Sequence, residues 1–408
     1  MGELQVTCDP AEVGLDRERL RRIDAHFARY VDEGRLPGWL VLVSRRGEIA
    51  HLSTCGARDL GSGAPVEPGT LFRIFSMTKP VVSVALMTLY EEGALTLDDP
   101  VADYIPSFAD LRVYESGPAS APVTRPAEEP IRIWHLLTHT SGLVYGWQRP
   151  DALGELYRNA GLAGLNLPGE NLADLADRVA GLPLLFDPGT GWTYSIGVDV
   201  LGRVIEVASG LPLERFLAER IFQPLGMADT GFWAEEGELH RAASLYAVGP
   251  DGRLTLTDPG DGMARRPKVP SGGSGLVSTA ADYHRFLQLL LRGGELDGVR
   301  LLGPRTVGYM TRNHLPGGAD LQAFARTPFG EAVPGEGFGL GFAVVQDPVA
   351  VRAISSPGEY HWGGAAGTVF WVDPAEEITV IFLTQAMGFG TRRIRTRLRQ
   401  LVHQAIVS

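Results

Sequence analysis

The chain has 408 residues, of which 44% are hydrophobic and 21% are charged, a composition typical of a globular protein with a large buried core. Its formal net charge of −11 disfavours nucleic acid and anionic membrane surfaces as partners, because both attract basic faces. The two cysteines, Cys8 and Cys55, could form one disulfide at most, which excludes a disulfide scaffold.

The first residues, MGELQVTCDP, lack the basic and apolar regions of a secretory signal. No apolar stretch approaches the roughly 20 residues that a helix needs to span a bilayer. We therefore expect a cytoplasmic protein that does not contact membranes. The sequence does not predict an oligomeric state.

In chain order, Asp16 can cap a helix whose apolar face includes Leu20, Ile23 and Phe27. WLVLVSRRGEIAHLSTCG then predicts two strands around an Arg46-Gly47 turn. Helical stripes follow in the segments LADLADRVAGL, DVLGRVIEVASG and LERFLAERIF. Three strands, in GLGFAVV, GTVFWVD and ITVIFLTQ, then precede a helix in RRIRTRLRQLVHQAIV. Two segments rich in Pro, Gly or Ser are predicted to be loops, residues 115–130 and 253–274.

Strands and a helix at each end, with helices between, predict an α+β fold. We expect one sheet built from both termini and flanked by helices, with a mostly helical insertion. The expected organisation is a single unit over residues 1–408. In it, residues 1–75 and 275–408 form an α/β subdomain and residues 76–274 a mostly helical one, with the active site between them.

A lysine in FSMTKP is the first sign of chemistry. The chain has only two lysines, Lys79 and Lys268, and every other Lys/Arg position is arginine. A lysine can lose its proton when it is buried, which an arginine in practice cannot do. Ser76 precedes Lys79 by three residues, so on a helix the two side chains would share a face.

Pro80 fits only near the start of a helix, because it has no N–H. We therefore predict a helix that begins close to Ser76 and continues to Gly93. Free backbone N–H groups at such a start suit the oxyanion of acyl transfer, and a neutral Lys79 could accept the Ser76 proton. A lone S-x-x-K is a weak motif, however, and a surface lysine at a helix start explains it equally well.

The neighbouring segments make the motif more specific. In order they are LFRIFSMTKP, EEGALTLDDPVADYIP, IRIWHLLTHTSGL, PGTGWTYSIGVDVLGRVIEVASGLPLERFLAERIFQPLGMADTGF, SGGSGLVSTAADYHRFLQLLL and HWGGAAGTVFWVD. Together they resemble the serine β-lactamase and penicillin-binding-protein superfamily from about residue 15 to residue 385. The resemblance is closest to the class C β-lactamase branch and its family VIII carboxylesterase relatives. It implies a β-lactamase/transpeptidase-like fold, in which the sheet built from both termini is antiparallel.

The resemblance implies roles for individual residues. Ser76 would be the nucleophile that forms an acyl-enzyme, and Lys79 would be its proton acceptor or electrostatic partner. Tyr194 would act as the second base or acid and would activate water for deacylation. The backbone N–H groups of Ser76 and Ala365 would form the oxyanion hole.

Two positions depart from the β-lactamase pattern. Ile196 stands where the lactamases have the asparagine of Tyr-x-Asn, and Trp362 stands where they have the lysine of Lys-Thr-Gly. Gly363 and Gly364 follow, where side chains would keep substrate away from the strand edge. With Phe75, these residues are the expected substrate contacts. Losing the two polar groups moves the expected specificity from amides and anions toward neutral, apolar acyl esters.

Several other features have simpler explanations. His135 and His139 have the i, i+4 spacing of a zinc helix but lack the glutamate of H-E-x-x-H and a third ligand, so we interpret them as packing or turn histidines. Ser274, in SGGSGL, is interpreted as part of a flexible turn, Lys268 as a solvated loop charge and Asp199 as a helix-surface residue. The tryptophans of the insertion could line a pocket, but most such residues belong to the core: Trp134, Trp147, Trp192 and Trp233.

The main hypothesis is a serine esterase that hydrolyses short- to medium-chain acyl esters through an acyl-enzyme on Ser76. Its expected partner is a small ester, and no cofactor or metal is expected. Alternatives within the same fold are a β-lactamase, a D-amino-acid amidase or peptidase, and an acyltransferase. A rival from another class is a penicillin-binding or scaffold protein that is acylated slowly or not at all.

Overall fold

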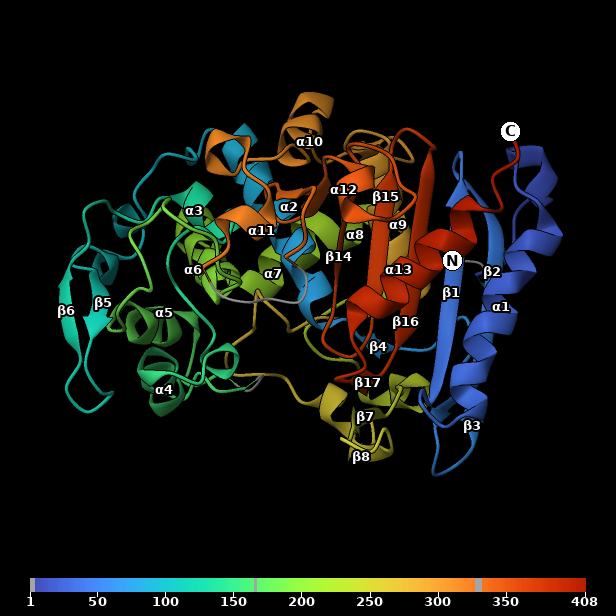
Figure 1. Cartoon of the computed structure of the whole chain (residues 1–408), viewed down its shortest axis with the longest axis horizontal. Coiled ribbons are helices and arrows are strands. Elements are labelled where there is room, and N and C mark those ends of the chain that lie inside the picture. Colours follow the sequence, from blue (N-terminus) through green and yellow to red (C-terminus); the bar gives the residue numbers. More distant parts are fainter. Residues whose placement is uncertain (1–3, 165–166, 327–331) are drawn as a thin grey trace.

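The computed structural model describes residues 4–164, 167–326 and 332–408. Within these ranges, a sheet of eight strands runs through the molecule and carries helices on its faces (Figure 1). Every neighbouring pair in this sheet is antiparallel. In spatial order its strands are β12 (Glu336–Phe338), β13 (Ala343–Val345), β14 (Tyr360–Gly363), β15 (Val369–Asp373), β16 (Ile378–Thr384), β1 (Gly38–Arg45), β2 (Glu48–Asp59) and β3 (Ala64–Pro65).

The sheet joins segments from both ends of the chain at one strand pair. β1 lies beside β16, with Trp39 opposite Thr384 and Arg45 opposite Ile378. β1 and β2 form the hairpin that was expected around Arg46-Gly47. The prediction of an α+β fold with a sheet built from both termini is therefore confirmed.

One face of the sheet is covered by α1 (Arg17–Asp32) and α13 (Thr391–His403). Because side chains alternate along a strand, Trp39, Val41 and Val43 pack under these helices, while Leu40 and Leu42 point into the opposite layer. All eight residues of β1 are buried. The side chain of Asp16 caps α1 as expected, by accepting a hydrogen bond from the Arg19 N–H at 2.9 Å.

The opposite face packs against α9 (Ala280–Leu291), beyond which lies the helical part of the molecule (Figure 1). At its centre, α2 (Thr78–Glu91) is buried along most of its length and contacts α6. A 3-10 turn, Phe75–Met77, leads into α2, so the helix begins where the Ser76 and Pro80 arrangement predicts. The other helices here are α3 (Ile133–Leu137), α4 (Ala152–Asn159), α5 (Leu172–Ala180), α6 (Gly197–Ser209) and α7 (Leu213–Leu217), which continues through a π-helical turn, Ala218–Phe222, into α8 (Gln223–Leu225).

The prediction that residues 115–130 and 253–274 are loops is wrong in part, because each range contains strand residues. The reason is pairing with neighbours outside the range, which composition does not reveal: β5 (Arg112–Ser116) pairs with β6 (Val123–Pro126), and β8 (Leu254–Asp258) pairs with β7 (Leu245–Val248). The remaining short strands are β4 (Phe72–Arg73) with β9 (Val277–Ser278), β10 (Glu295–Leu296) with β11 (Val299–Arg300), and β17 (Ala386–Met387) beside β7.

The continuous strand predicted in GLGFAVV is also corrected. Only its last residues belong to β13, and the chain turns between β12 and β13. Gly341 has a φ of 98°, and a Cβ there would lie 2.4 Å from the Ser83 Oγ of α2. The glycine is therefore needed for a turn packed against α2. Three short helices lie in this part of the chain, α10 (Pro304–Met310), α11 (Leu321–Phe324) and α12 (Pro348–Val351).

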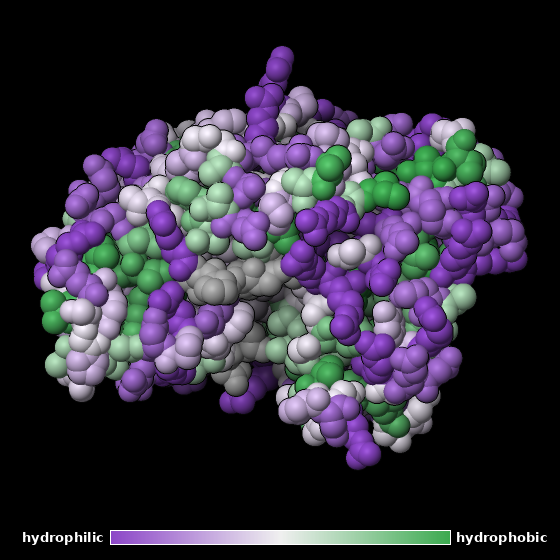
Figure 2. Space-filling model, in the orientation of Figure 1, coloured by the Kyte–Doolittle hydropathy of each residue, from purple (hydrophilic) through white to green (hydrophobic). Residues whose placement is uncertain are grey.

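Among the described residues, no helix has the length and apolarity that would let it cross a bilayer. Polar and charged side chains cover much of the face shown in Figure 2, with smaller apolar patches between them.

Candidate active site

Ser76 lies at a sharp turn between β4 and α2. The preceding residue, Phe75, has a φ of 45°, a left-handed conformation that non-glycine residues rarely adopt. Its side chain packs against Leu245, Ala366 and Met387, contacts that hold this conformation in place. The turn leaves Ser76 partly exposed at the start of the helical segment, while Lys79 is buried one turn later.

The structure brings three of the expected catalytic residues together. The Tyr194 hydroxyl donates a hydrogen bond to Ser76 Oγ at 2.7 Å, and Lys79 Nζ lies 3.4 Å from the same oxygen. Tyr194 comes from the segment just before α6, far from Ser76 in sequence. A serine hydroxyl with two proton-exchanging groups in reach is the arrangement that nucleophilic catalysis requires.

Lys79 is held by the segment that was interpreted as a flexible turn. Its Nζ donates a hydrogen bond to the carbonyl of Gly273 at 2.7 Å. It also lies 4.5 Å from the centre of the Tyr194 ring and 5.4 Å from that of Tyr145. The Ser271–Gly275 turn is therefore part of the site: it fixes Lys79, and Ser274 lines the cavity beside it.

Asp199 was expected on a helix surface, and this expectation is wrong. Its side chain is 1% exposed and faces the turn that holds Lys79, accepting hydrogen bonds from Ser271 Oγ at 2.5 Å and from the Gly273 N–H at 3.0 Å. Burial raises the pKa of Asp199, and the positive charge of Lys79 opposes that rise. A carboxylate that fixes Gly273 also fixes the carbonyl that Lys79 uses.

Tyr145 completes this wall of the site. Its hydroxyl lies 3.4 Å from the second carboxylate oxygen of Asp199, and its ring centre lies 5.4 Å from that of Tyr194. Burial, followed by the nearby carboxylate, holds the pKa of Tyr145 well above its usual value. Tyr145 therefore stays a neutral phenol that donates to Asp199.

Of the expected oxyanion and substrate residues, four lie at or just after the end of β14: Trp362, Gly363, Gly364 and Ala365. Ala365 is exposed and lines the cavity next to Ser76. Within the described parts of the chain, no hydrogen-bond acceptor occupies its N–H. A Cβ on Gly364 would lie 2.3 Å from Thr368 Oγ1 and 2.4 Å from the Ile74 carbonyl. Gly364 is thus required for close packing beside the nucleophile turn, in addition to the substrate access that was expected.

A cavity of about 510 Å³ opens beside Ser76. The Trp362 ring forms part of its wall and packs against Tyr194, with 5.4 Å between ring centres. Described residues that line the cavity are Phe75, Ser76, Tyr145, Trp147, Ala163, Gly164, Leu167, Tyr194, Asp199, Ser271, Ser274, Trp362, Gly363, Gly364, Ala365, Met387, Gly388, Gly390 and Thr391. The lining is mostly apolar, and Asp199 is the one residue of this set with a carboxylate side chain.

Ile196 does not take the position expected for it. It is fully buried next to the first residue of α6 and is not among the described cavity residues. The expected substrate contact was carried over from the lactamase asparagine, whereas an isoleucine here packs into the core. Of the four tryptophans considered, Trp147 lines this cavity and is 54% exposed, whereas Trp192 is fully buried.

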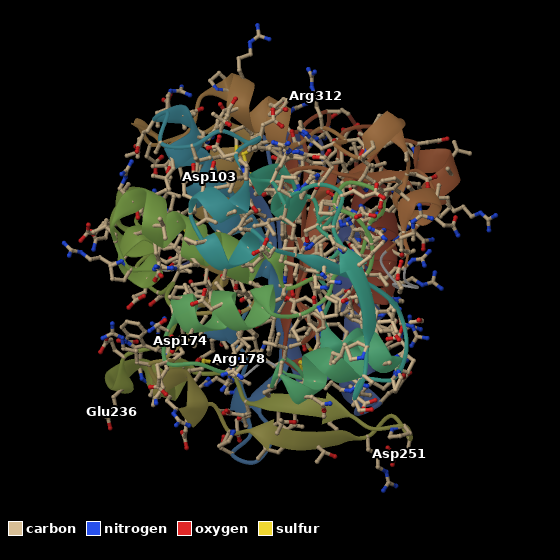
Figure 3. The ribbon with its side chains drawn as sticks, turned by 90° about the vertical axis from the view of Figure 1, so that its left-hand side faces the viewer. Asp103, Asp174, Arg178, Glu236, Asp251 and Arg312 are labelled. Atoms are coloured by element: carbon tan, nitrogen blue, oxygen red, sulfur yellow. The ribbon has the colours of Figure 1, made fainter. Side chains whose placement is uncertain are left out.

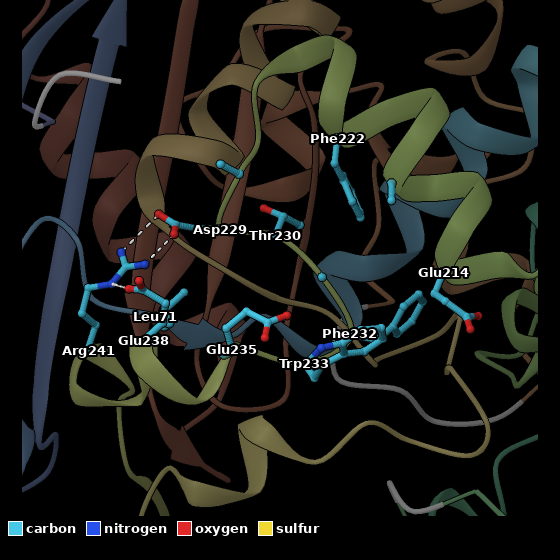
Figure 4. A pocket seen from close by; sticks show the side chains of 14 residues that line it. Leu71, Glu214, Phe222, Asp229, Thr230, Phe232, Trp233, Glu235, Glu238 and Arg241 are labelled. Atoms are coloured by element: carbon cyan, nitrogen blue, oxygen red, sulfur yellow. Dashed lines mark hydrogen bonds and ion pairs between the residues drawn. The ribbon is translucent and has the colours of Figure 1, made fainter.

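A second cavity, of about 230 Å³, lies away from Ser76, around Phe222, Trp233 and Arg241 (Figure 4). Its acidic residues include Asp229 and Glu238, both paired with Arg241. The Thr230 hydroxyl is hydrogen-bonded to Asp282. Thr230 is also hydrogen-bonded to Ser278, and the described lining residues include no lysine. The grouping of a serine with a lysine and a tyrosine therefore points to the first cavity.

The two histidines with zinc-like spacing serve different contacts. His135 Nδ1 accepts a hydrogen bond from the Arg132 N–H at 2.9 Å, whereas His139 Nδ1 faces Ser195 Oγ at 3.1 Å. Both are buried, which agrees with their interpretation as packing and turn residues. Lys268 is exposed in a loop and pairs with Glu170.

In the described part of the chain, one group of side chains could in principle hold a metal ion: Glu359, Asp373 and His403. It is buried near α13, and the Arg399 guanidinium pairs with Glu359 there. An arginine already supplies a cation to this group, and none of its members lines the Ser76 cavity.

Charged residues such as Asp103, Asp174, Arg178 and Arg312 point outward from the molecule (Figure 3).

The chain can be compared with known proteins. It is 37% identical over 364 residues to Protein Rv1367c of Mycobacterium tuberculosis (strain ATCC 25618 / H37Rv), covering 88% of each chain. It is 36% identical over 402 residues to esterase EstB of Burkholderia gladioli, covering 94% of each. Among solved structures it resembles EstCE1, described as a hydrolase with promiscuous acyltransferase activity. That match has a TM-score of 0.78 and 28% identity, and it covers 95% of this chain and 99% of the other.

The fold and the site together define a serine hydrolase with the β-lactamase fold. A model described as Beta-lactamase matches residues 23–404, so the chain belongs to the Beta-lactamase family.

Proposed function

We propose that the protein is a serine esterase that hydrolyses short- to medium-chain acyl esters through an acyl-enzyme on Ser76. The observation that carries the proposal is the contact of Ser76 Oγ with both Tyr194 and Lys79 at the mouth of a mostly apolar cavity. The esterase EstB, which is similar over nearly the whole chain, supports the same reaction class.

In the proposed acylation step, the Lys79 and Tyr194 pair starts with one proton fewer than an ammonium and a phenol together carry. Ser76 Oγ attacks the ester carbonyl carbon and its proton passes to this pair. Two coupled groups this close share protons, so the base is best described as the pair. The carbonyl oxygen becomes an oxyanion that the N–H groups of Ser76 and Ala365 would stabilise, each donor being worth about 3 kcal/mol. The pair then returns the proton to the departing alcohol.

In the proposed deacylation step, water takes the place of the alcohol. The pair accepts a proton from the water as the water oxygen attacks the acyl carbon, and then protonates Ser76 Oγ as it leaves. Because Lys79 Nζ donates a hydrogen bond to the Gly273 carbonyl at 2.7 Å, Lys79 keeps its position through both steps.

The cavity supports the preference for neutral acyl groups. Trp362, Leu167 and Met387 provide apolar walls, and the described lining contains no lysine, arginine or histidine. A carboxylate-bearing β-lactam would therefore find no cation there, whereas a butyryl chain would find apolar surface. A volume of about 510 Å³ accommodates an acyl group of several carbons and its alcohol together.

A second candidate function is acyl transfer to an alcohol other than water. It is favoured by the likeness to EstCE1, a hydrolase with promiscuous acyltransferase activity. The cavity leaves room for an alcohol beside the acyl chain. Product analysis in the presence of added alcohols, with ester formation against acid release, separates this candidate from hydrolysis.

The deciding experiment measures steady-state hydrolysis of p-nitrophenyl acetate and butyrate beside nitrocefin, with Ser76→Ala as the control. The esterase proposal expects rapid ester turnover, slow nitrocefin turnover and an inactive Ser76→Ala. Rapid nitrocefin turnover would instead indicate a β-lactamase. A single acylation per chain without turnover would indicate a binding protein.

A further inference from the structure

We propose that His139 is a positioning residue for Tyr194, holding the tyrosine at Ser76 by contacts on both sides of it. The inference rests on the proposed function, because it assigns His139 a part in the same acyl transfer. His139 does not touch Ser76, so its effect on the reaction would pass entirely through Tyr194.

The first observation is that His139 binds both sequence neighbours of Tyr194. Its carbonyl accepts a hydrogen bond from the Thr193 N–H at 3.0 Å, and its Nδ1 lies 3.1 Å from Ser195 Oγ. The residues on either side of the tyrosine are thus tied to one histidine. A shift of His139 would move the backbone from which the Tyr194 side chain projects.

The second observation is that the imidazole packs directly against the tyrosine ring. The two ring centres are 4.8 Å apart at an interplanar angle of 62°, an edge-to-face geometry that aromatic pairs favour. On its other sides, the imidazole packs against Phe338 and Trp192, at 5.3 Å and 6.1 Å between centres. His139 is 1% exposed, so the support it gives to Tyr194 is rigid.

The third observation is the backbone of His139, whose φ is 59°. Left-handed backbone is costly for a residue with a side chain and is kept where surrounding structure requires it. Here the next residue, Thr140, donates its N–H to the His135 carbonyl and accepts the Gly189 N–H. These bonds fix the turn that aims the imidazole at Tyr194.

The charge state of the imidazole agrees with a supporting role. Burial, followed by the positive charge of Lys79, places the pKa of His139 well below its ordinary value. At neutral pH the ring is uncharged, and its low pKa makes it a poor acceptor for the Ser76 proton. Steering of Tyr194 is the contribution that remains, and a 1 Å displacement of a catalytic group can cost about 10²-fold in rate.

The test replaces His139 with asparagine. Asparagine tolerates left-handed backbone better than most residues and keeps a short polar group, but it removes the ring that packs on Tyr194. With p-nitrophenyl butyrate, we expect kcat to fall about 10–100-fold while KM changes less than about twofold, since substrate does not touch His139. His284→Asn is the matched control, because it removes a buried histidine of α9 that takes no part in these contacts, and it should keep kcat.

A double-mutant comparison separates positioning from general structural support. In a Tyr194→Phe background the phenolic oxygen is absent, so His139→Asn should then lower kcat by less than about twofold. An equal loss in both backgrounds, or unchanged kcat in the single variant, would overturn the proposal. If His139→Asn does not fold, Ser195→Ala removes the side-chain partner of the imidazole. We expect it to lower kcat about fivefold, and unchanged kcat would again overturn the proposal.

A second assay separates failure of the inference about His139 from failure of the esterase proposal. It measures the rate at which a fluorophosphonate labels Ser76, which reports activation of the serine without an ester substrate. If wild-type enzyme turns over no ester but is labelled, the esterase proposal fails and the labelling rates of the same variants still test His139. If esters are turned over and His139→Asn keeps both kcat and labelling rate, only the inference about His139 fails.

Discussion

Tyr194 donates a hydrogen bond to Ser76 across 2.7 Å, although the two residues come from separate elements, one preceding α6 and the other preceding α2. Lys79 reaches the same serine oxygen from within the nucleophile helix. Ser76 and Lys79, three residues apart at the start of α2, therefore share one proton-transfer site with a tyrosine that is distant in sequence.

Replacing Lys79 with arginine tests whether this residue must lose a proton. Arginine keeps the positive charge and can still reach the Gly273 carbonyl, but it cannot act as a base. We expect Lys79→Arg to lower kcat for p-nitrophenyl butyrate by about 10²–10⁴-fold with a far-UV circular dichroism spectrum like that of the wild type. Substantial turnover in this variant would show that the charge of Lys79, rather than its proton, matters.

Tyr194→Phe should slow both chemical steps, because the same hydroxyl faces Ser76 in acylation and would face water in deacylation. The expected loss is again about 10²–10⁴-fold in kcat. Stopped-flow release of p-nitrophenol resolves the burst and the steady state, and both should fall. A variant that loses only the steady-state rate would restrict Tyr194 to deacylation.

The buried carboxylate of Asp199 gives a third prediction. Asp199→Ala removes the acceptor for Ser271 and Gly273, which frees the turn whose carbonyl holds Lys79. We expect kcat to fall about 10–100-fold. Asp199→Asn keeps an acceptor oxygen for the turn and should lose less. Steady-state kinetics of the two variants side by side provide the check, and equal activity of Asp199→Ala and wild type would contradict this role.

Stability should depend on pH through His284. Burial, followed by nearby arginines, lowers its pKa to about 4, whereas an unfolded histidine titrates near 6.5. Below pH 6.5 the unfolded chain therefore binds the extra proton, and stability present above that pH is lost as the pH falls toward 4. The contribution is about 3 kcal/mol at most.

Urea unfolding between pH 7.5 and pH 4.5 measures this effect. His284→Gln cannot take up the proton, so its free energy of unfolding should decline less steeply than that of the wild type. His240→Gln, at an exposed histidine, is the matched control and should follow the wild-type slope. A His284→Gln slope equal to that of the wild type would assign the acid sensitivity to other groups.

The sequence predicts the parts of the site that depend on local geometry. Ser76 and Lys79 share a helix face by spacing alone, and Pro80 marks where that helix begins. Tyr194 needed the family resemblance, because nothing local distinguishes it from a core aromatic residue. In the same way, β1 and β2 follow from alternating apolar residues and a turn, and β16 from a compact apolar run.

Residues whose environment comes from distant segments could not be predicted in this way. Asp199 occupies the first turn of α6, where acidic residues are commonly solvated and favoured by the helix dipole. It is buried because the Ser271–Gly275 turn closes over it. Tyr145 belongs to the site because its hydroxyl faces the buried carboxylate of Asp199. Ile196 was expected to contact substrate because it stands at the position of the lactamase asparagine. Its side chain is instead buried in the core.

The pairing of β1 with β16 has a consequence for biosynthesis. During translation, β1 and β2 can form their hairpin early, but the other edge of β1 stays unpaired until β16 has been made. An open apolar strand edge is prone to associate with other chains, and contacts between segments so distant in sequence form slowly. The nascent protein should therefore depend on chaperones for most of its synthesis. Mutations that weaken the β16 strand should reduce the yield of folded enzyme more than the activity of the molecules that do fold.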